Sequence, residues 1–135
     1  MFHTLEDEVA VSPQITASDV AEAARQGYKT IVSNRPDGEE PGQPDAAAIA
    51  AAAEAAGLRF VHVPIGREGP SPLDVEAMAA AIDASGKTLA YCRSGMRSAT
   101  LWALARARQG QEADTLIARA RDAGYDLSGL RGHLS

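Results

Sequence analysis

Hydrophobic and polar positions follow two alternating periods along the chain. Short runs rich in β-branched and aliphatic residues, separated by Gly- and Pro-containing stretches, predict strands at residues 9–12, 29–34, 59–65 and 87–91. Between and after these runs, apolar residues recur with the spacing of one helical face. This spacing predicts helices over residues 16–26, 45–56, 74–84, 98–108 and 112–123, with a short helix near residue 128.

Several of the predicted helices carry recognisable ends. Thr16 and Asp19 have the spacing of a capping box, in which each residue satisfies a free N–H group of the first turn. Asp45 precedes an alanine-rich segment as an N-cap, and Gly57 and Gly86 follow helical segments as stop signals. These signals fix the order strand, helix, strand, helix along most of the chain.

Strands that alternate with helices pair in parallel through right-handed crossovers. We therefore expect one α/β domain over residues 1–135, with three layers and a mostly parallel sheet of four to five strands flanked by helices. Ligands of such sheets bind beyond the carboxyl ends of the strands. Three loops lead from that edge, namely 35–44, 66–72 and 92–97.

Charge is distributed unevenly over the 135 residues. Residues 1–89 contain six Lys or Arg and fourteen Asp or Glu, a sum of −8, whereas residues 90–135 contain seven Arg and four acids, a sum of +3. The overall charge of −5 argues against general nucleic-acid binding. The cationic segment includes the loop at 92–97, which favours a small anionic ligand there.

The single cysteine, Cys92, excludes an internal disulfide and a cysteine-rich zinc site. The N-terminal segment is acidic and lacks the basic and apolar regions of a signal peptide. No apolar run approaches the ~20 residues of a membrane span. We therefore expect a soluble cytoplasmic protein with neither nucleic acid nor membrane as a partner.

The stretch YCRSGMRSA, residues 91–99, places Cys92 between a predicted strand and a predicted helix. Backbone N–H groups of residues 93–97 can converge at the helix N-terminus, where they bind an oxyanion and favour a thiolate over a thiol. Gly95 gives the backbone the freedom to turn. Arg97 can hold two oxygens of an anion with its planar fork, and Ser98 can cap the helix or donate to the thiolate.

The same residues could instead have a purely structural role, without catalysis or anion binding. A lone cysteine at the end of a strand is commonly a small buried residue, and arginines at a helix start are commonly solvated. The Ser-Gly-Met-Arg-Ser sequence that follows Arg93 favours a nucleophilic role for Cys92 and an anion-binding role for Arg93 and Arg97.

Three stretches carry a family resemblance: YCRSGMRSATLWAL, ITASDVAEAARQGYKTIVSNRPDGEE and AAGLRFVHVPIG. They resemble the phosphatase-like domain of beta-lactamase-hydrolase-like proteins. The resemblance implies a fold like that of dual-specificity phosphatases and an activity that is either phosphatase or rhodanese-like sulfurtransferase. It also implies a persulfide-oxidising enzyme as a partner, because the family often occurs fused to one.

Details of the loop favour sulfur transfer within that resemblance. Four residues separate Cys92 from Arg97, as in rhodaneses, whereas tyrosine phosphatases have five. Tyr91 stands where phosphatases usually have His. The loop GREGPSP contains no Asp to protonate a leaving oxygen, so Glu68 is the one carboxylate there that could serve as general acid.

The leading hypothesis is therefore a sulfurtransferase. Cys92 takes sulfur from thiosulfate or a persulfide, becomes a persulfide and passes the sulfur to a thiol, without metal or organic cofactor. The loop residues Arg93, Ser94, Gly95, Met96 and Ser98 surround the sulfur, and Arg97 binds the anionic end of the donor. Arg35 binds its distal end or forms a surface pair with Asp37. The alternatives are a phosphatase acting on a phosphoester through a phosphocysteine intermediate, and a non-catalytic oxyanion-binding module.

Overall fold

A five-stranded, mostly parallel sheet forms the centre of the computed structural model, which describes residues 2–134. The strands follow the spatial order β1-β2-β5-β3-β4, and only the β1–β2 pair is antiparallel. This arrangement confirms the predicted sheet. The strands are β1 (His3–Glu6), β2 (Val9–Ser12), β3 (Tyr28–Ser33), β4 (Arg59–His62) and β5 (Lys87–Tyr91).

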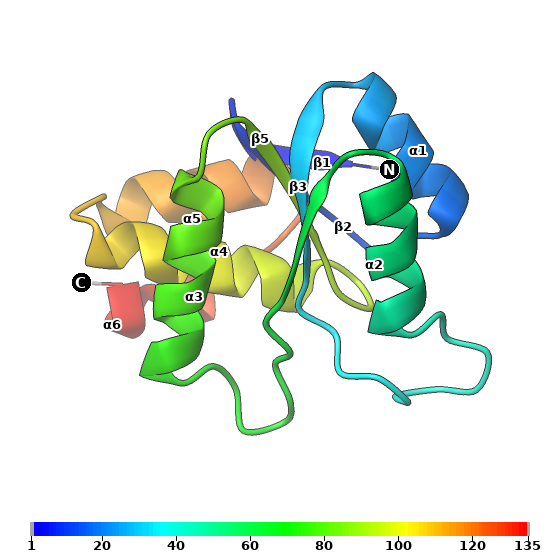
Figure 1. Cartoon of the computed structure of the whole chain (residues 1–135). Coiled ribbons are helices and arrows are strands. Elements are labelled where there is room, and N and C mark those ends of the chain that lie inside the picture. Colours follow the sequence, from blue (N-terminus) through cyan, green and yellow to red (C-terminus); the bar gives the residue numbers. More distant parts are fainter. Residues whose placement is uncertain (1, 135) are drawn as a thin grey trace.

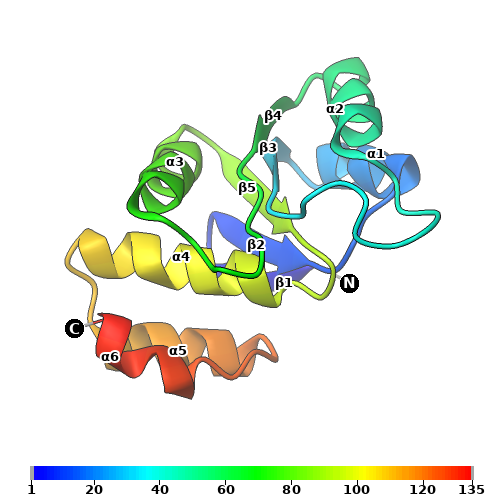
Figure 2. The ribbon, with the colours of Figure 1, turned by 90° about the horizontal axis from the view of Figure 1, so that it is seen from below.

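Helices cover both faces of this sheet and produce the three predicted layers (Figure 1). Helices α1 and α2 lie on one face, and α3 and α4 lie on the other. Figure 2 shows α5 and α6 packed against the outer side of α4. The helices are α1 (Ala17–Arg25), α2 (Ala46–Ala55), α3 (Pro72–Asp83), α4 (Met96–Arg108), α5 (Ala113–Asp122) and α6 (Arg131–Leu134), with a 3₁₀ turn at Ser128–Leu130 before α6.

Side chains that alternate along the central strands divide the core into two clusters. In β5, Leu89 packs on the side of α1 and α2, whereas Ala90 packs on the side of α3 and α4. Ile31 and Val32 divide in the same way along β3. All four residues are fully buried, because a sheet covered on both faces has no solvent-facing side.

Capping residues begin three of the helices. Thr16 and Asp19 form the predicted capping box of α1, and the side chain of Asp45 accepts the N–H of Ala48 at the start of α2. Helix α3 begins two residues before its predicted start. Ser71 and Asp74 form a second capping box there. Pro72 occupies the first turn, where a backbone N–H would have no acceptor within the helix, so the N–H that proline lacks is not missed.

One strand and two further boundaries differ markedly from the sequence analysis. Strand β1 was not predicted, because it is a short edge strand in which only Leu5 is buried. Strand β4 ends at His62, well before residue 65, and Pro64 has no N–H to extend the ladder. Helix α4 begins at Met96 and not at Ser98, because Gly95 turns the chain into the helix earlier.

The carboxyl ends of the parallel strands bring the three predicted loops together. Asn34, after β3, donates its N–H to the carbonyl of Tyr91 at 2.8 Å, and Ile65 donates to the carbonyl of Asn34 at 3.1 Å. The N–H of Cys92 reaches the carbonyl of Ser12 at 3.3 Å. The Cys92 loop is thus held from both sides. Within residues 2–134, every helix is too short or too polar to cross a membrane.

Truncating a leucine to alanine should lower the free energy of unfolding in proportion to how deeply that side chain is buried. Leu89 has no exposed surface, whereas Leu73 is 75% exposed. Replacing Leu89 with Ala should lower the free energy of unfolding by about 2–5 kcal/mol, because it leaves a cavity between closely packed layers. The matched Leu73→Ala change should stay within about 0.5 kcal/mol. Urea unfolding of both variants measures the difference, and equal losses would contradict the described core.

Candidate active site

Cys92 lies directly after β5, at the N-terminus of α4. Its side chain is almost fully buried, and the Gly95 N–H donates to its Sγ at 3.1 Å. A helix N-terminus contributes about half a positive charge there. An anion that enters the loop would have the negative charge of its oxygens stabilised by this helix N-terminus.

The turn between Cys92 and α4 depends on Gly95. Its φ of 97° lies in the left-handed region, and it is the N-cap of α4. A Cβ at this position would lie 2.1 Å from the hydroxyl oxygen of Tyr125. That hydroxyl donates to the carbonyl of Ser94 at 3.1 Å, and the Ser94 hydroxyl accepts the N–H of Met96 at 3.2 Å. Gly95 is therefore required by both conformation and space.

Arg97, in the first turn of α4, holds a carboxylate with the end of its guanidinium. Nη1 donates to Glu39 Oε2 at 2.7 Å, and Nη2 donates to Glu39 Oε1 at 2.8 Å. Nη1 also donates to the carbonyl of Ile65 at 2.8 Å. Hydrogen bonding to Glu39 raises the pKa of Arg97 most, and the nearby Cys92 adds to the rise. Arg97 thus lies in the first turn of the helix whose N-terminus follows Cys92, with its guanidinium held by Glu39 and Ile65.

Arg35 is buried, which differs from the predicted position at an open edge. Its side chain is 1% exposed, and it donates to Glu39 at 2.9 Å, to Glu40 at 2.9 Å and to Gln14 at 3.0 Å. Burial alone would lower the pKa of Arg35, but Glu40 and Glu39 raise it overall. Asp37 caps the start of α2 and does not pair with Arg35. The guanidinium is therefore occupied by the protein's own acceptors.

Glu39 lies between two arginines, and its pKa is lowered to about 2, first by the hydrogen bond from Arg97 and also by Arg35. Its Oε1 accepts from both guanidinium groups. The pKa of Glu40 is also lowered, mainly by the hydrogen bond from Arg35. Both carboxylates are ionised at neutral pH and offset much of the positive charge around the loop.

The other predicted loop residues occupy different environments. Arg93 is 68% exposed on its side chain and approaches Glu40 at 3.6 Å. Met96 is 38% exposed. Ser98 is fully buried, and its hydroxyl has no hydrogen-bond partner within residues 2–134. The predicted capping of α4 by Ser98 is wrong, because the helix already begins at Met96.

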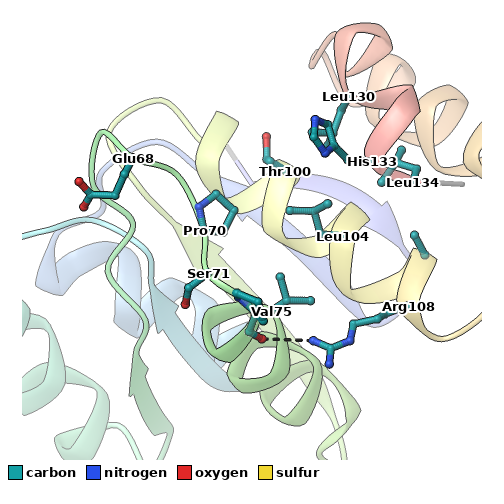
Figure 3. Close-up of a pocket in the computed structure, with 12 residues that line it drawn as sticks. Glu68, Pro70, Ser71, Val75, Thr100, Leu104, Arg108, Leu130, His133 and Leu134 are labelled. Carbon is teal, nitrogen blue, oxygen red and sulfur yellow. Dashed lines mark hydrogen bonds between the residues drawn. The ribbon is translucent and has the colours of Figure 1, made fainter.

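Glu68 lies in the loop between β4 and α3, where it is exposed. It lines a pocket of about 720 Å³ together with Thr100, Leu104 and residues of α3 and α6. In Figure 3 its carboxylate points away from the other residues of this pocket. The structure does not bring Glu68 into hydrogen-bonding contact with Cys92 or Arg97, so its role as general acid stays a prediction.

Four residues at the site were not singled out from the sequence: Gln14, Glu39, Glu40 and Tyr125. The two glutamates sit in a Pro- and Gly-rich loop whose charges resemble those of a solvated turn. Figure 2 shows this loop on the same side of the sheet as the β5–α4 turn. Tyr125 lies 31 residues beyond Ser94, and no motif links the two.

Most of the chain matches one known protein family. Residues 1–109 match the model of the family described as beta-lactamase hydrolase-like protein, phosphatase-like domain. The chain belongs to this family. The predicted resemblance is thereby confirmed over the segment that contains Cys92, Arg97 and the glutamates that contact the arginines.

Relatives in the family are longer than this chain. The beta-lactamase hydrolase-like protein of Xylella fastidiosa is 36% identical over 125 residues, which cover 91% of this chain and 29% of the relative. The chain therefore spans less than a third of the curated relatives that it matches.

Solved structures give the same fold. A candidate phosphatase from Neisseria meningitidis is 40% identical, with a TM-score of 0.85 over 98% of this chain and 94% of its own. The Pseudomonas aeruginosa protein TpbA, solved in complex with pTyr, has a TM-score of 0.65 at 21% identity, covering 98% of this chain and 89% of its own, a likeness of fold alone. Both structures confirm a cysteine-phosphatase-like fold, and the family description together with the 40% identical candidate phosphatase favours the phosphatase alternative over the predicted sulfurtransferase.

Gly95 offers a test of the turn with an internal control. Gly110 has a similar φ of 95°, but a Cβ there would meet nothing within 4 Å. Gly110→Ala should cost about 1–2 kcal/mol from the left-handed conformation alone. Gly95→Ala should cost about 1–3 kcal/mol more, because the Cβ clashes with Tyr125. Equal losses in chemical denaturation would contradict the described contact.

The ion pairs of Glu39 predict a component of stability that depends on pH. Its pKa in the folded protein, about 2, lies below its ordinary value of 4.5, so the ionised carboxylate stabilises the folded state above about pH 4.5. That stabilisation is lost as the pH falls from 4.5 toward 2. The difference in unfolding free energy between the natural protein and Glu39→Gln should therefore shrink over this range. Urea unfolding across it measures the effect, and a constant difference would refute it.

Proposed function

We propose that the domain is a cysteine-dependent phosphatase that hydrolyses a phosphomonoester, with Cys92 as nucleophile and Arg97 as the ligand of the phosphoryl oxygens. The observation that carries this proposal is that Cys92 Sγ accepts the Gly95 N–H at 3.1 Å and that Arg97 lies in the first turn of the same helix, α4. The choice of phosphate is supported by the family and by the 40% identical candidate phosphatase.

In the first step the Cys92 thiolate attacks phosphorus. An S–P bond forms, and the bond from phosphorus to the leaving oxygen breaks, with its electron pair remaining on that oxygen. The Gly95 N–H and Arg97 stabilise the negative charge on the equatorial oxygens, which is greatest in the transition state. The product of this step is a phosphocysteine and the free alcohol or phenol.

In the second step water attacks the phosphocysteine. The S–P bond breaks, inorganic phosphate leaves, and the Cys92 thiolate is restored. Its departure is favoured by the same helix N-terminus that stabilises the resting thiolate. Within residues 66–71 Glu68 is the only carboxylate that could give a proton to the leaving oxygen and take one from the water. With Glu68 exposed in this structure, water is the other source of that proton.

Two features of the loops make sulfur transfer a second candidate function. The loop has four residues between Cys92 and Arg97, and no Asp lies in the β4–α3 loop. Transfer from thiosulfate needs no proton donor, because sulfite departs as a stable anion. Cys92 would then attack the outer sulfur, form a persulfide and pass that sulfur to a thiol.

Variants of Cys92 and Arg97 test the phosphatase proposal. Cys92→Ser should abolish hydrolysis of an aryl phosphate with little change in stability, because the exchange is nearly isosteric. Arg97→Lys should lower kcat/KM by about 10²-fold or more, because an ammonium group cannot hold two oxygens at once. Steady-state kinetics with 4-nitrophenyl phosphate or phosphotyrosine measure both effects. Unchanged turnover in either variant would refute the assigned roles.

One preparation can separate the two reactions. Mass spectrometry after a short exposure to substrate should find Cys92 heavier by one phosphoryl group in the phosphatase case. After exposure to thiosulfate, an adduct heavier by one sulfur, together with faster turnover than on the aryl phosphate, would establish sulfur transfer instead. Neither adduct, with sulfate still bound, would identify a non-catalytic anion-binding module.

A further inference from the structure

The guanidinium of Arg97 has five N–H groups, and the protein uses three of them. Glu39 takes one from each terminal nitrogen, and the Ile65 carbonyl takes the second from Nη1. The Nε–H and the second Nη2–H donate neither to Glu39 nor to Ile65, and Cys92 is the further group that interacts with this guanidinium. Both belong to the same edge of the planar group. That edge has the spacing of two oxygens of one anion.

Glu39 can fix the orientation of this edge because Arg35 in turn holds the Glu39 carboxylate in place. Its Oε1 accepts from Arg35 Nε at 2.9 Å as well as from Arg97. Arg35 is buried and donates in three directions, so its own orientation is fixed. The chain of contacts Arg35–Glu39–Arg97 therefore runs from a rigid, buried group to the anion-binding edge.

The same buried group also contacts the other end of the Cys92 loop. Arg35 Nη1 donates to the side chain of Gln14, whose backbone N–H donates to the carbonyl of Arg93 at 3.3 Å. Both Arg93 and Arg97 are thus connected to Arg35, one through Gln14 and one through Glu39. Relative motion of the two loop ends is restricted by one side chain.

We propose that Glu39 is a positioning residue for Arg97, anchored by Arg35, and that it holds the Nε–Nη2 edge of Arg97 toward an oxyanion bound in the Cys92 loop. Glu39 does not touch the anion. This proposal rests on Arg97 as the anion ligand of the proposed function, but it requires no turnover and no particular reaction.

The proposal predicts whether anion binding weakens or strengthens when the charge of Glu39 is removed. If Glu39 acted only through its negative charge, or if it competed with the anion for Arg97, its neutralisation would strengthen anion binding. If it positions Arg97, neutralisation frees the guanidinium to rotate, so the bound state has to order it again, and anion binding weakens. The two interpretations therefore predict opposite changes in one equilibrium constant.

The experiment measures the dissociation constant of sulfate, an inert tetrahedral anion, by isothermal titration calorimetry on the full chain. Glu39→Gln should weaken sulfate binding by about fivefold or more, since Gln has lost one of two charge-assisted acceptors. Glu76→Gln, an exposed residue of α3, is the matched control for the change in net charge and should stay within about twofold. Unchanged or tighter sulfate binding in Glu39→Gln would overturn the proposal.

Nuclear magnetic resonance gives a readout that a loss of packing alone would not produce. In the natural protein the Nε–H signal of Arg97, identified by its absence in Arg97→Lys, should be sharp and should shift when sulfate is added. In Glu39→Gln it should broaden through side-chain rotation while the backbone spectrum stays folded. A sharp, sulfate-responsive signal in that variant would also overturn the proposal.

Single and double variants test whether Arg35 acts on Arg97 through Glu39. Because Arg35 acts on Arg97 through Glu39, the double variant Arg35→Lys/Glu39→Gln should bind sulfate about as weakly as Glu39→Gln alone, a non-additive result. Additive losses would remove Arg35 from the chain of contacts. If Arg35→Lys does not fold, Gln14→Ala, Glu39→Gln and their double variant are compared instead. Both side chains accept from the Arg35 guanidinium, so their losses should again be non-additive, and additive losses would remove Arg35 as the shared anchor. Absence of phosphatase activity with normal sulfate binding would refute the proposed function and leave this inference standing.

Discussion

A buried guanidinium is the charge around which the carboxyl edge of the sheet is organised. Removing the charge of Arg35 from water is costly unless it is paired and hydrogen bonded. Gln14, Glu39 and Glu40 satisfy that requirement, and each belongs to a segment that reaches the site. The 35–44 loop therefore folds back over the Cys92 loop, and Glu39 meets Arg97 as a consequence. The conformation of the proposed anion site therefore depends on the pairing of a buried charge that the anion would not contact.

Most of the fold could be predicted from the sequence because its signals are local. Four of the strands follow apolar runs, and the start of α1 follows from a capping box three residues wide. Strand β1 escaped prediction, because an antiparallel edge strand of four residues with one buried side chain has no distinct period. The helix start at Met96 was missed because it depends on a left-handed glycine, Gly95, and not on a capping side chain.

The candidate site could be predicted only as far as one contiguous loop carries it. Cys92, Gly95 and Arg97 lie within six consecutive residues, so their grouping is visible in the chain. Glu39 lies 58 residues from Arg97, and its pairing is set by where Arg35 is buried, which no periodicity encodes. Reaction type is a further step removed. It depends on proton donors and substrate shape, so the loop spacing, Tyr91 and the missing Asp favoured sulfur transfer where the relatives favour phosphate.

The contact between Gly95 and Tyr125 has a consequence for how much of the chain the Cys92 loop needs. Tyr125 lies outside the segment that the family model matches, yet its ring fills the space beside the Cys92 loop. A side chain at 95 would be strained by the left-handed φ and would also need a smaller residue at 125, whereas a smaller residue at 125 alone would leave a void beside the loop. The segment after α5 therefore completes the packing of the turn into α4, and a chain cut at residue 109 would lack the ring that fills this space.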